Sequence, residues 1–155
     1  MAGEIEARLK TLGIVLPVPG KPAANYVPFV VTGKLLFLSG QVPMTPEGVK
    51  YVGKLGREFS IEEGQQAARL CAINLLGVAQ AAVGDLDRIQ RIVKVVGFVN
   101  ATPDFPDVHK VVNGASDLIT DVLGDAKGKH ARSAIGMGTL PLGVAVEVEA
   151  IAEIA

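Results

Sequence analysis

Cysteine is nearly absent from this sequence, and its scarcity excludes two classes of small protein. Cys71 is the only cysteine among 155 residues, so neither an intrachain disulfide nor a cysteine-rich metal site can form. The two histidines, His109 and His130, lie far from each other along the chain and have no nearby cysteine. We therefore expect no bound metal.

Aromatic residues and net charge are also scarce. The chain has no tryptophan, two tyrosines and five phenylalanines, too few for an obvious platform on which single-stranded nucleic acid could stack. The formal net charge is −1 and the isoelectric point is about 6.1. The only basic cluster consists of Lys127, Lys129, His130 and Arg132. We therefore expect no nucleic-acid partner.

Long hydrophobic runs are missing as well. No apolar run reaches the roughly 20 residues that are needed to span a bilayer. The N-terminus, with Glu4, Glu6, Arg8 and Lys10, lacks the apolar segment of a signal peptide. These absences predict no membrane association and a cytoplasmic location.

Apolar residues are nevertheless abundant overall. Hydrophobic residues make up 49% of the chain and charged residues 20%, with a mean hydropathy of +0.38. Such values favour one soluble, folded domain over residues 1–155, without linkers or repeats. Because a domain of this size has a large surface, part of the apolar excess is expected at subunit interfaces, which favours an oligomer.

The first half of the chain predicts one helix, a hairpin and a long loop. Ile5, Leu9 and Leu12 form one stripe of a short helix, and the prolines that follow it stop regular structure. In order, the predicted elements are a helix at 3–12, a proline-rich lead-in to residue 23, strands at 27–31 and 35–39, and a loop at 44–56 with a short strand near Tyr51.

The second half alternates helices with strands. Ser60 and Glu63 have the spacing of a capping box and open the first long helix, whose small apolar residues suit close packing on a sheet. Gly124 is the predicted stop of the second long helix. The remaining predicted elements are a strand at 92–99, a helix that begins near Asp104 and Pro106, and strands at 133–137 and 144–154. The whole order is a helix followed by ββαβαββ, which is an α/β (α+β) fold.

Spacing alone favours ordinary roles for the polar residues that could carry chemistry. The last predicted strand alternates, with Val146 and Val148 on one face and Glu147 and Glu149 on the other. For these glutamates, a solvated surface is a simpler interpretation than acid–base work. His109 lies off the apolar stripe of its helix, which favours a surface position. Arg132 could hold a carboxylate through two parallel hydrogen bonds, but a surface arginine is the simpler interpretation. No phosphate-binding loop and no GxSxG nucleophile motif is present.

Two segments resemble the signatures of a known family. Ala131-Arg132-Ser133, then Leu140-Pro141, then VEVEAIA at 146–152, resemble the C-terminal signature of the Rid family (YjgF type), reactive-intermediate deaminases that are also named L-PSP endoribonucleases. Leu38-Ser39-Gly40-Gln41-Val42-Pro43 resembles the family's other recurrent segment. The similarity covers about residues 24–155. It implies a chorismate-mutase-like fold assembled as a homotrimer, with the sheets in a central barrel and clefts between subunits.

The resemblance also implies a chemistry and a set of residues. In the deaminase branch, an arginine clamps the carboxylate of a 2-imino acid while water attacks the imine carbon, which yields a 2-keto acid and ammonia without a cofactor. The implied residues are Arg132 as the clamp, Glu147 as the water-orienting carboxylate, Tyr26 in the pocket, backbone groups near Ser39 and Gly40, and one polar residue of the second long helix, either His109 or Asn113.

Some positions depart from the family pattern, and two alternative functions stay open. Ala134 stands where well-known members have cysteine, His130 stands where proline is usual, and the 44–60 loop is longer. Residues 125–131 also extend the chain and could form the rim of the cleft. The expected partner is a small 2-imino or 2-keto acid. The alternatives are a non-catalytic trimer that binds a small carboxylate metabolite and, less favoured by the composition, an endoribonuclease.

Overall fold

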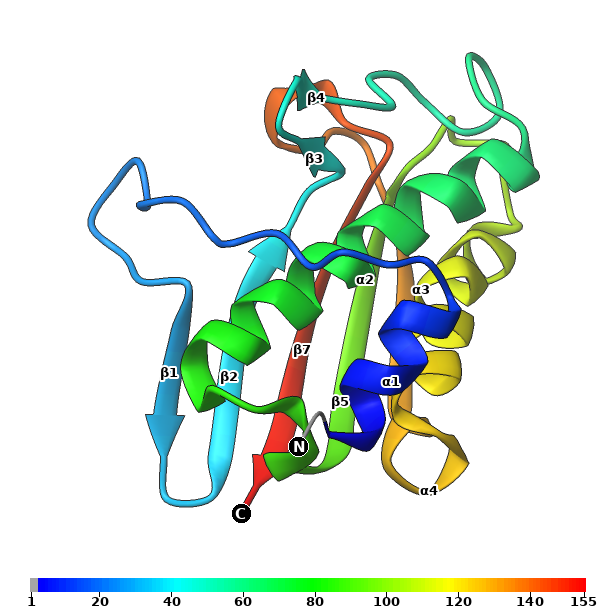
Figure 1. Ribbon diagram of the computed structural model, residues 1–155. Helices are drawn as coiled ribbons and strands as arrows, with labels where there is room; N and C mark the ends of the chain where they lie inside the picture. Colours follow the sequence, from blue (N-terminus) through cyan, green and yellow to red (C-terminus); the bar gives the residue numbers. More distant parts are fainter. Residues whose placement is uncertain (1–2) are drawn as a thin grey trace.

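A five-stranded sheet occupies the middle of the fold in the computed structural model, which describes residues 3–155 (Figure 1). The strands lie in the order β1-β2-β7-β5-β6. Strands β5 and β6 run parallel, and the other neighbouring pairs are antiparallel. The strands are β1 (Phe29–Thr32), β2 (Leu35–Gln41), β5 (Ile89–Asn100), β6 (Ala131–Met137) and β7 (Val146–Ile154). This mixed α+β fold confirms the predicted element order.

Two long helices cover one face of the sheet (Figure 1). The helices are α1 (Glu4–Thr11), α2 (Ile61–Val83), α3 (Val108–Leu123) and α4 (Asp125–Gly128), and short 3₁₀ turns lie at Leu86–Arg88 and Pro141–Gly143. The hydroxyl of Ser60 accepts a hydrogen bond from the backbone N–H of Glu63 at 3.2 Å, which confirms the predicted cap of α2. Gly124 follows α3 with a φ of 80°, as its predicted stop requires.

Helix α2 is the core helix of the fold. Its small side chains have no exposed surface, which fits the predicted close packing; they are Ala67, Ala68, Cys71 and Ala72. Cys71 donates a hydrogen bond from its thiol to the backbone carbonyl of Val146 at 3.4 Å. Within residues 3–155, α2 alone is long and apolar enough to cross a membrane, but most of that stretch is buried. Its burial accounts for its apolar composition.

Strand β7 alternates between the two faces of the sheet, as the sequence predicts. The side chains under the helices are buried; they are Val146, Val148, Ala150, Ala152 and Ile154. Glu147, Glu149, Ile151 and Glu153 therefore point to the other face. The strand begins two residues later than predicted: Ala145 still accepts from the backbone N–H of Asn100 in β5, but its own N–H donates to the carbonyl of Tyr51, outside the sheet.

Other predicted segments differ in detail from the structure or gain an element there. The 44–56 loop contains a short hairpin, β3 (Met44–Thr45) and β4 (Gly48–Val49), and Tyr51 lies outside any strand with a φ of 53°. Strand β1 begins at Phe29 rather than at residue 27, because Pro28 has no N–H to give to the ladder. Residues 125–128, which belong to the segment that could form the rim of the cleft, fold into the short helix α4.

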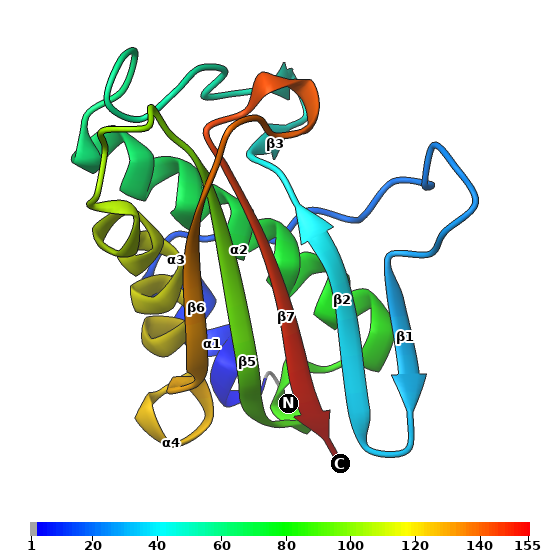
Figure 2. The ribbon, with the colours of Figure 1, turned by 180° about the vertical axis from the view of Figure 1, so that it is seen from behind.

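No helix of residues 3–155 covers the second face of the sheet (Figure 2). Several of its apolar side chains are exposed; they include Val30, Leu35, Phe37 and Ile135. Monomeric soluble proteins rarely expose an apolar patch of this kind without a partner for it. We call this surface the open face.

Candidate functional site

Four of the residues implied by the family resemblance line one cavity. Tyr26, Ser39, Gly40 and Glu147 lie around a space of about 450 Å³. Tyr26 precedes β1, Ser39 and Gly40 lie near the end of β2, and Glu147 is the second residue of β7. The lead-in before β1 forms another wall of this cavity. We call this space the Glu147 cavity.

A β-bulge brings Gly40 against Glu147. Leu38 pairs with Ala150, but Gln41 pairs with Val148, so β2 has one extra residue between these pairs. Such bulges locally bend a strand and are common beside active sites. A Cβ atom on Gly40 would collide with Oε1 of Glu147 and would lie 3.1 Å from its Cδ. Only glycine therefore leaves room for the carboxylate in this position.

The protonation of Glu147 is shifted by its surroundings. Burial raises the pKa of the Glu147 carboxyl above its ordinary value, and the negative charge of Glu149 raises that pKa further. No hydrogen bond from the described residues offsets these two effects. A carboxylate with a raised pKa is a stronger base, which suits it to take a proton from water. Among residues 3–155, no group of three or more His, Cys, Asp or Glu side chains could hold a metal ion.

Ser39 fastens the segment that carries Tyr26 to the sheet. Its hydroxyl donates to the backbone carbonyl of Val27 at 2.7 Å, and its backbone N–H donates to the carbonyl of Pro28 at 2.9 Å. Tyr26, just before these residues, is 58% exposed. Tyr26 lines the Glu147 cavity and is exposed enough to contact a ligand or a neighbouring chain.

Arg132 lies in a separate cluster, on the edge strand β6 beside α3. Its Nη1 donates to Oδ1 of Asn113 at 2.8 Å and to the hydroxyl of Ser116 at 3.2 Å. Its Nη2 donates to the backbone carbonyl of His109 at 3.3 Å. Both candidates on α3 thus touch Arg132, Asn113 through its side chain and His109 through its backbone. The His109 ring is exposed, and neither residue lines the Glu147 cavity.

His130 completes this cluster through Ser116. Its Nδ1 lies 2.6 Å from the carbonyl of Gly128, which can only accept, so Nδ1 carries a hydrogen and donates it. Its Nε2 lies 2.9 Å from the hydroxyl of Ser116. Burial lowers the pKa of His130, and the charge of Arg132 lowers it further, although the bond to Gly128 opposes them. In the neutral ring Nε2 accepts from Ser116, whose oxygen is then free to accept from Arg132.

Strand register places Arg132 and Glu147 on opposite faces of the sheet. Arg132 pairs with Val95, which is fully buried under the helices. Phe98 lies three residues after Val95 in β5, and because side chains alternate along a strand, Phe98 points to the open face. Glu147 pairs with Phe98 and therefore points to the open face as well. On β6, the residue that pairs with Phe98 is Ile135, so Ile135 and not Arg132 is level with Glu147 across the sheet. The Arg132 guanidinium and the Glu147 carboxylate of a single chain therefore cannot both contact one small molecule.

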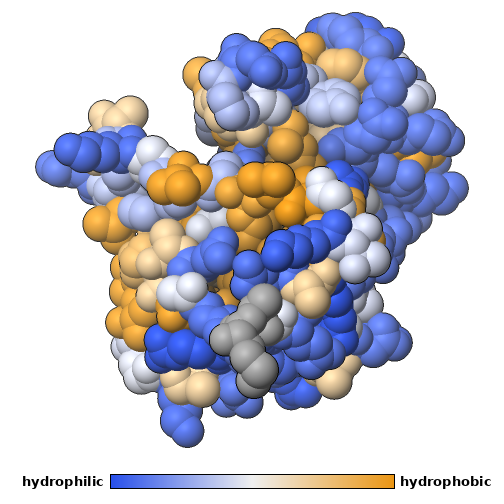
Figure 3. All heavy atoms as spheres, viewed as in Figure 1, coloured by the Kyte–Doolittle hydropathy of each residue, from blue (hydrophilic) through white to orange (hydrophobic). Residues whose placement is uncertain are grey.

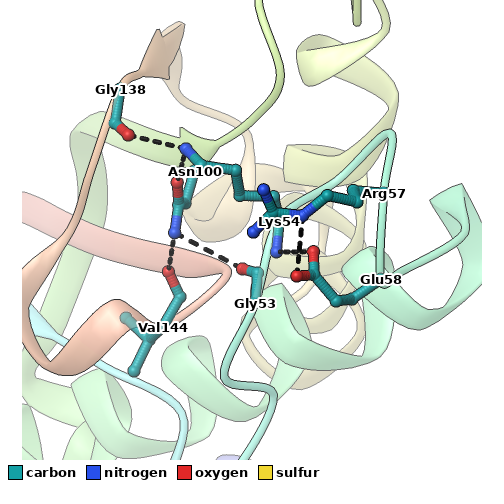
Figure 4. Close-up of polar contacts among 7 residues, drawn as sticks. All are labelled: Gly53, Lys54, Arg57, Glu58, Asn100, Gly138 and Val144. Carbon is teal, nitrogen blue, oxygen red and sulfur yellow. Dashed lines mark hydrogen bonds and ion pairs between the residues drawn. The ribbon is translucent and has the colours of Figure 1, made fainter.

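A third polar cluster positions the start of β7, and no sequence pattern predicted it (Figure 4). Lys54 donates from Nζ to Oδ1 of Asn100 and to the carbonyl of Gly138, each at 2.6 Å. Asn100 donates from Nδ2 to the carbonyls of Val144 at 3.1 Å and Gly53 at 3.4 Å. These bonds tie the long 44–60 loop to the ends of β5 and β6 and to the residues just before β7. Only tertiary structure joins these residues, which no motif links.

The comparisons with known proteins agree with this fold. The family model described as "YjgF/chorismate_mutase-like, putative endoribonuclease" matches residues 6–154. Protein TCP17 from Trypanosoma cruzi is 48% identical over 153 residues, which are 99% of this chain and 96% of that protein.

Solved structures extend the similarity to three dimensions. Protein Atu1372 from Agrobacterium tumefaciens superposes with a TM-score of 0.90 at 49% identity, covering 97% of this chain and 92% of that one. E. coli TdcF, solved with bound serine, superposes with a TM-score of 0.62 at 25% identity, covering 90% and 94%. The family match over nearly the whole chain, together with these relatives, shows that the chain belongs to the YjgF/chorismate mutase-like family.

Proposed function

We propose that this protein hydrolyses 2-imino acids to 2-keto acids and ammonia. The observation that carries the proposal is the half-buried Glu147 carboxylate, held over Gly40 in a cavity, with a raised pKa. In the proposed reaction, the oxygen of a water molecule attacks the imine carbon while Glu147 takes a proton from that water. Glu147 returns this proton to the imine nitrogen, which gives an adduct that carries a hydroxyl and an amino group on one carbon. The hydroxyl proton then moves to the nitrogen as the carbon–nitrogen bond breaks, so that ammonia leaves and the carbonyl of the keto acid forms.

Arg132 would hold the carboxylate of the substrate. A guanidinium has five N–H donors, and three of them are engaged by Asn113, Ser116 and the carbonyl of His109. The two that remain are the number that a bidentate carboxylate takes. The contacts to α3 would at the same time keep the guanidinium from swinging away. The bound serine of the relative TdcF supports a small carboxylate ligand for this chain as well.

The site would be completed between chains. Strand β6, with Arg132, is one edge of the sheet, and β1, next to the Glu147 cavity, is the other edge. A head-to-tail ring would set the β6 edge of one chain against the β1 edge of the next. The exposed apolar residues of the open face would then be buried inside the ring. The family resemblance implies three chains in that ring, and we propose a homotrimer.

A non-catalytic trimer that binds a small carboxylate ligand is the second candidate, because the TdcF structure contains a bound serine and this by itself indicates binding rather than catalysis. An assay of imine hydrolysis distinguishes the enzyme from the binding protein. Imines generated in situ by an amino-acid oxidase should release ammonia faster with this protein than without it. Saturable binding of a 2-keto acid with no such acceleration would instead establish a binding protein.

Mixing two inactive variants tests the shared site. Arg132→Ala and Glu147→Gln should each lack activity, and refolding them together should restore roughly a quarter of wild-type activity, because each interface draws one side from each of two chains. Mass spectrometry would verify that mixed trimers form. Mixed trimers without recovered activity would place both groups in one chain or in separate roles, and monomers in light scattering would exclude the ring.

A further inference from the structure

A second cavity adjoins the Glu147 cavity. It has a volume of about 340 Å³, and both cavities are lined by Pro19, Gly20, Gln41, Met44 and Val78. Figure 3 shows the surface hollowed between the protruding lead-in and the β3–β4 hairpin, with hydrophobic atoms beside the hollow. A ligand that is anchored near Glu147 has room to extend past these shared residues. We call this second space the side pocket.

The lead-in that walls the side pocket is held firmly against α2. A Cβ atom on Gly77 of α2 would collide with the carbonyl oxygen of Pro17 and would lie 3.2 Å from its Cδ. Glycine at this position therefore lets the lead-in rest directly on the helix. The rings of Pro17 and Pro19 fix their own φ angles, so this wall loses little conformational entropy when a ligand binds.

Two polar side chains of the side pocket, those of Asn74 and Thr45, offer acceptors, whereas Gln41 at the junction with the Glu147 cavity gives one amide hydrogen to the carbonyl of Ser39 and keeps the other. Asn74 is 8% exposed, and its Nδ2 donates to the carbonyls of Val42 at 2.9 Å and Met44 at 3.1 Å. Both amide hydrogens are thereby used, and among residues 3–155 no donor reaches its Oδ1. Thr45 likewise donates its hydroxyl hydrogen within the hairpin, where the carbonyl of Gly48 lies at 3.1 Å and Oε2 of Glu47 at 3.5 Å. Asn74 and Thr45 can therefore each offer only an oxygen acceptor to a ligand.

The rest of the side pocket is apolar and uncharged. Prolines, Val18, Met44 and Val78 make up most of its lining, and no described residue that lines it is charged. A charged ligand group would thus meet no partner of opposite sign there. An apolar stem that ends in an uncharged N–H or O–H group would match both the walls and the acceptors.

We propose that the side pocket binds the substrate's own side chain, an apolar stem that ends in a neutral hydrogen-bond donor. This inference rests on the proposed function, because the imino-acid group must occupy the Glu147 cavity for the side chain to reach past Gln41. It assigns specificity to the lead-in, Thr45 and Asn74, which lie outside the reacting groups.

Calorimetric binding of 2-keto acids to the full-length protein tests the assignment. The probes are pyruvate and three longer 2-keto acids of one chain length that end in a methyl, an amide or a carboxylate group. Amide and carboxylate have nearly the same shape, so their comparison isolates hydrogen donation and charge. We expect the amide-ended acid to bind about tenfold tighter than the carboxylate-ended one, with the methyl-ended acid between them.

Thr45→Val removes one acceptor while keeping the shape of the side chain. It should weaken the amide-ended acid by about threefold and leave the methyl-ended acid within a factor of about two. The matched control is Thr11→Val, since the Thr11 hydroxyl bonds only within α1, to the carbonyl of Ala7. Equal binding of the amide and carboxylate probes, or a Thr45→Val variant that binds the amide like the control, would overturn the proposed specificity. Failure of every probe, pyruvate included, would instead overturn the proposed function.

Discussion

The Gly40→Ala substitution separates the position of Glu147 from the stability of the fold. Gly40 does not adopt a left-handed backbone conformation, so alanine is allowed by its φ angle. The new methyl group would collide with Oε1 of Glu147 and crowd its Cδ and Cγ atoms at 3.1 and 3.2 Å. These atoms belong to a flexible side chain, which can turn away at a cost of about 0.5–1.5 kcal/mol. We therefore expect a folded protein whose carboxylate is displaced.

Displacement of Glu147 should cost activity rather than stability. A positioned general base contributes on the order of 10²–10⁴ in rate, so turnover of Gly40→Ala should fall at least about tenfold. The unfolding midpoint should fall by no more than about 5 °C, since about 1 kcal/mol corresponds to roughly 2–4 °C in a chain of this size. Ammonia release from in situ imines and thermal unfolding followed by circular dichroism measure the two effects.

Gly33 provides the opposite control. It lies in the β1–β2 turn with a φ of +57°, and no atom lies within 4 Å of a Cβ placed on it. Alanine there should cost about 1–2 kcal/mol through backbone strain while leaving turnover unchanged. If Gly40→Ala keeps wild-type turnover, or if Gly33→Ala loses as much turnover as Gly40→Ala does, the argued placement of Glu147 is wrong.

Three further predictions concern buried or clustered groups. Because the folded-state pKa of Glu147 is raised, the stability linked to its proton is present below its ordinary pKa of 4.5 and is lost as pH rises through the raised value. Glu147→Gln should thus unfold at a higher temperature than wild type at pH 7. The unfolding temperatures of the two proteins should converge below about pH 4. Burial, assisted by the charge of Glu147, raises the pKa of the Cys71 thiol well above its ordinary value. A chromogenic disulfide reagent should therefore leave the native protein unmodified and label one thiol per chain after denaturation. Labelling of the native protein would contradict this burial. Ser116→Ala removes one of the three contacts that hold Arg132 and should raise KM by about threefold to tenfold with a smaller change in kcat, whereas an unchanged KM would mean that Ser116 does not position the guanidinium.

Local patterns in the sequence were sufficient to predict most of the fold. Ser60 and Glu63 predicted the start of α2, and Gly124 predicted the end of α3, because capping and left-handed stops depend on a few neighbouring residues. The alternation of small apolar residues with glutamates in β7 likewise predicted which side chains the helices cover. The motif around Arg132 identified the family for the same reason, since a motif is a local pattern.

The arrangement of the site depends on contacts that no local pattern contains. One extra residue in β2 sets Gly40 under the Glu147 carboxylate, and the same registers put Arg132 on the opposite face of the sheet. Lys54 reaches Asn100 across 46 positions of the chain, and Ser116 reaches His130 from a different element. The sequence by itself determined which residues carry charge and which elements they occupy. Only the tertiary structure decided which of them meet, because strand register and helix packing are settled by the whole core at once.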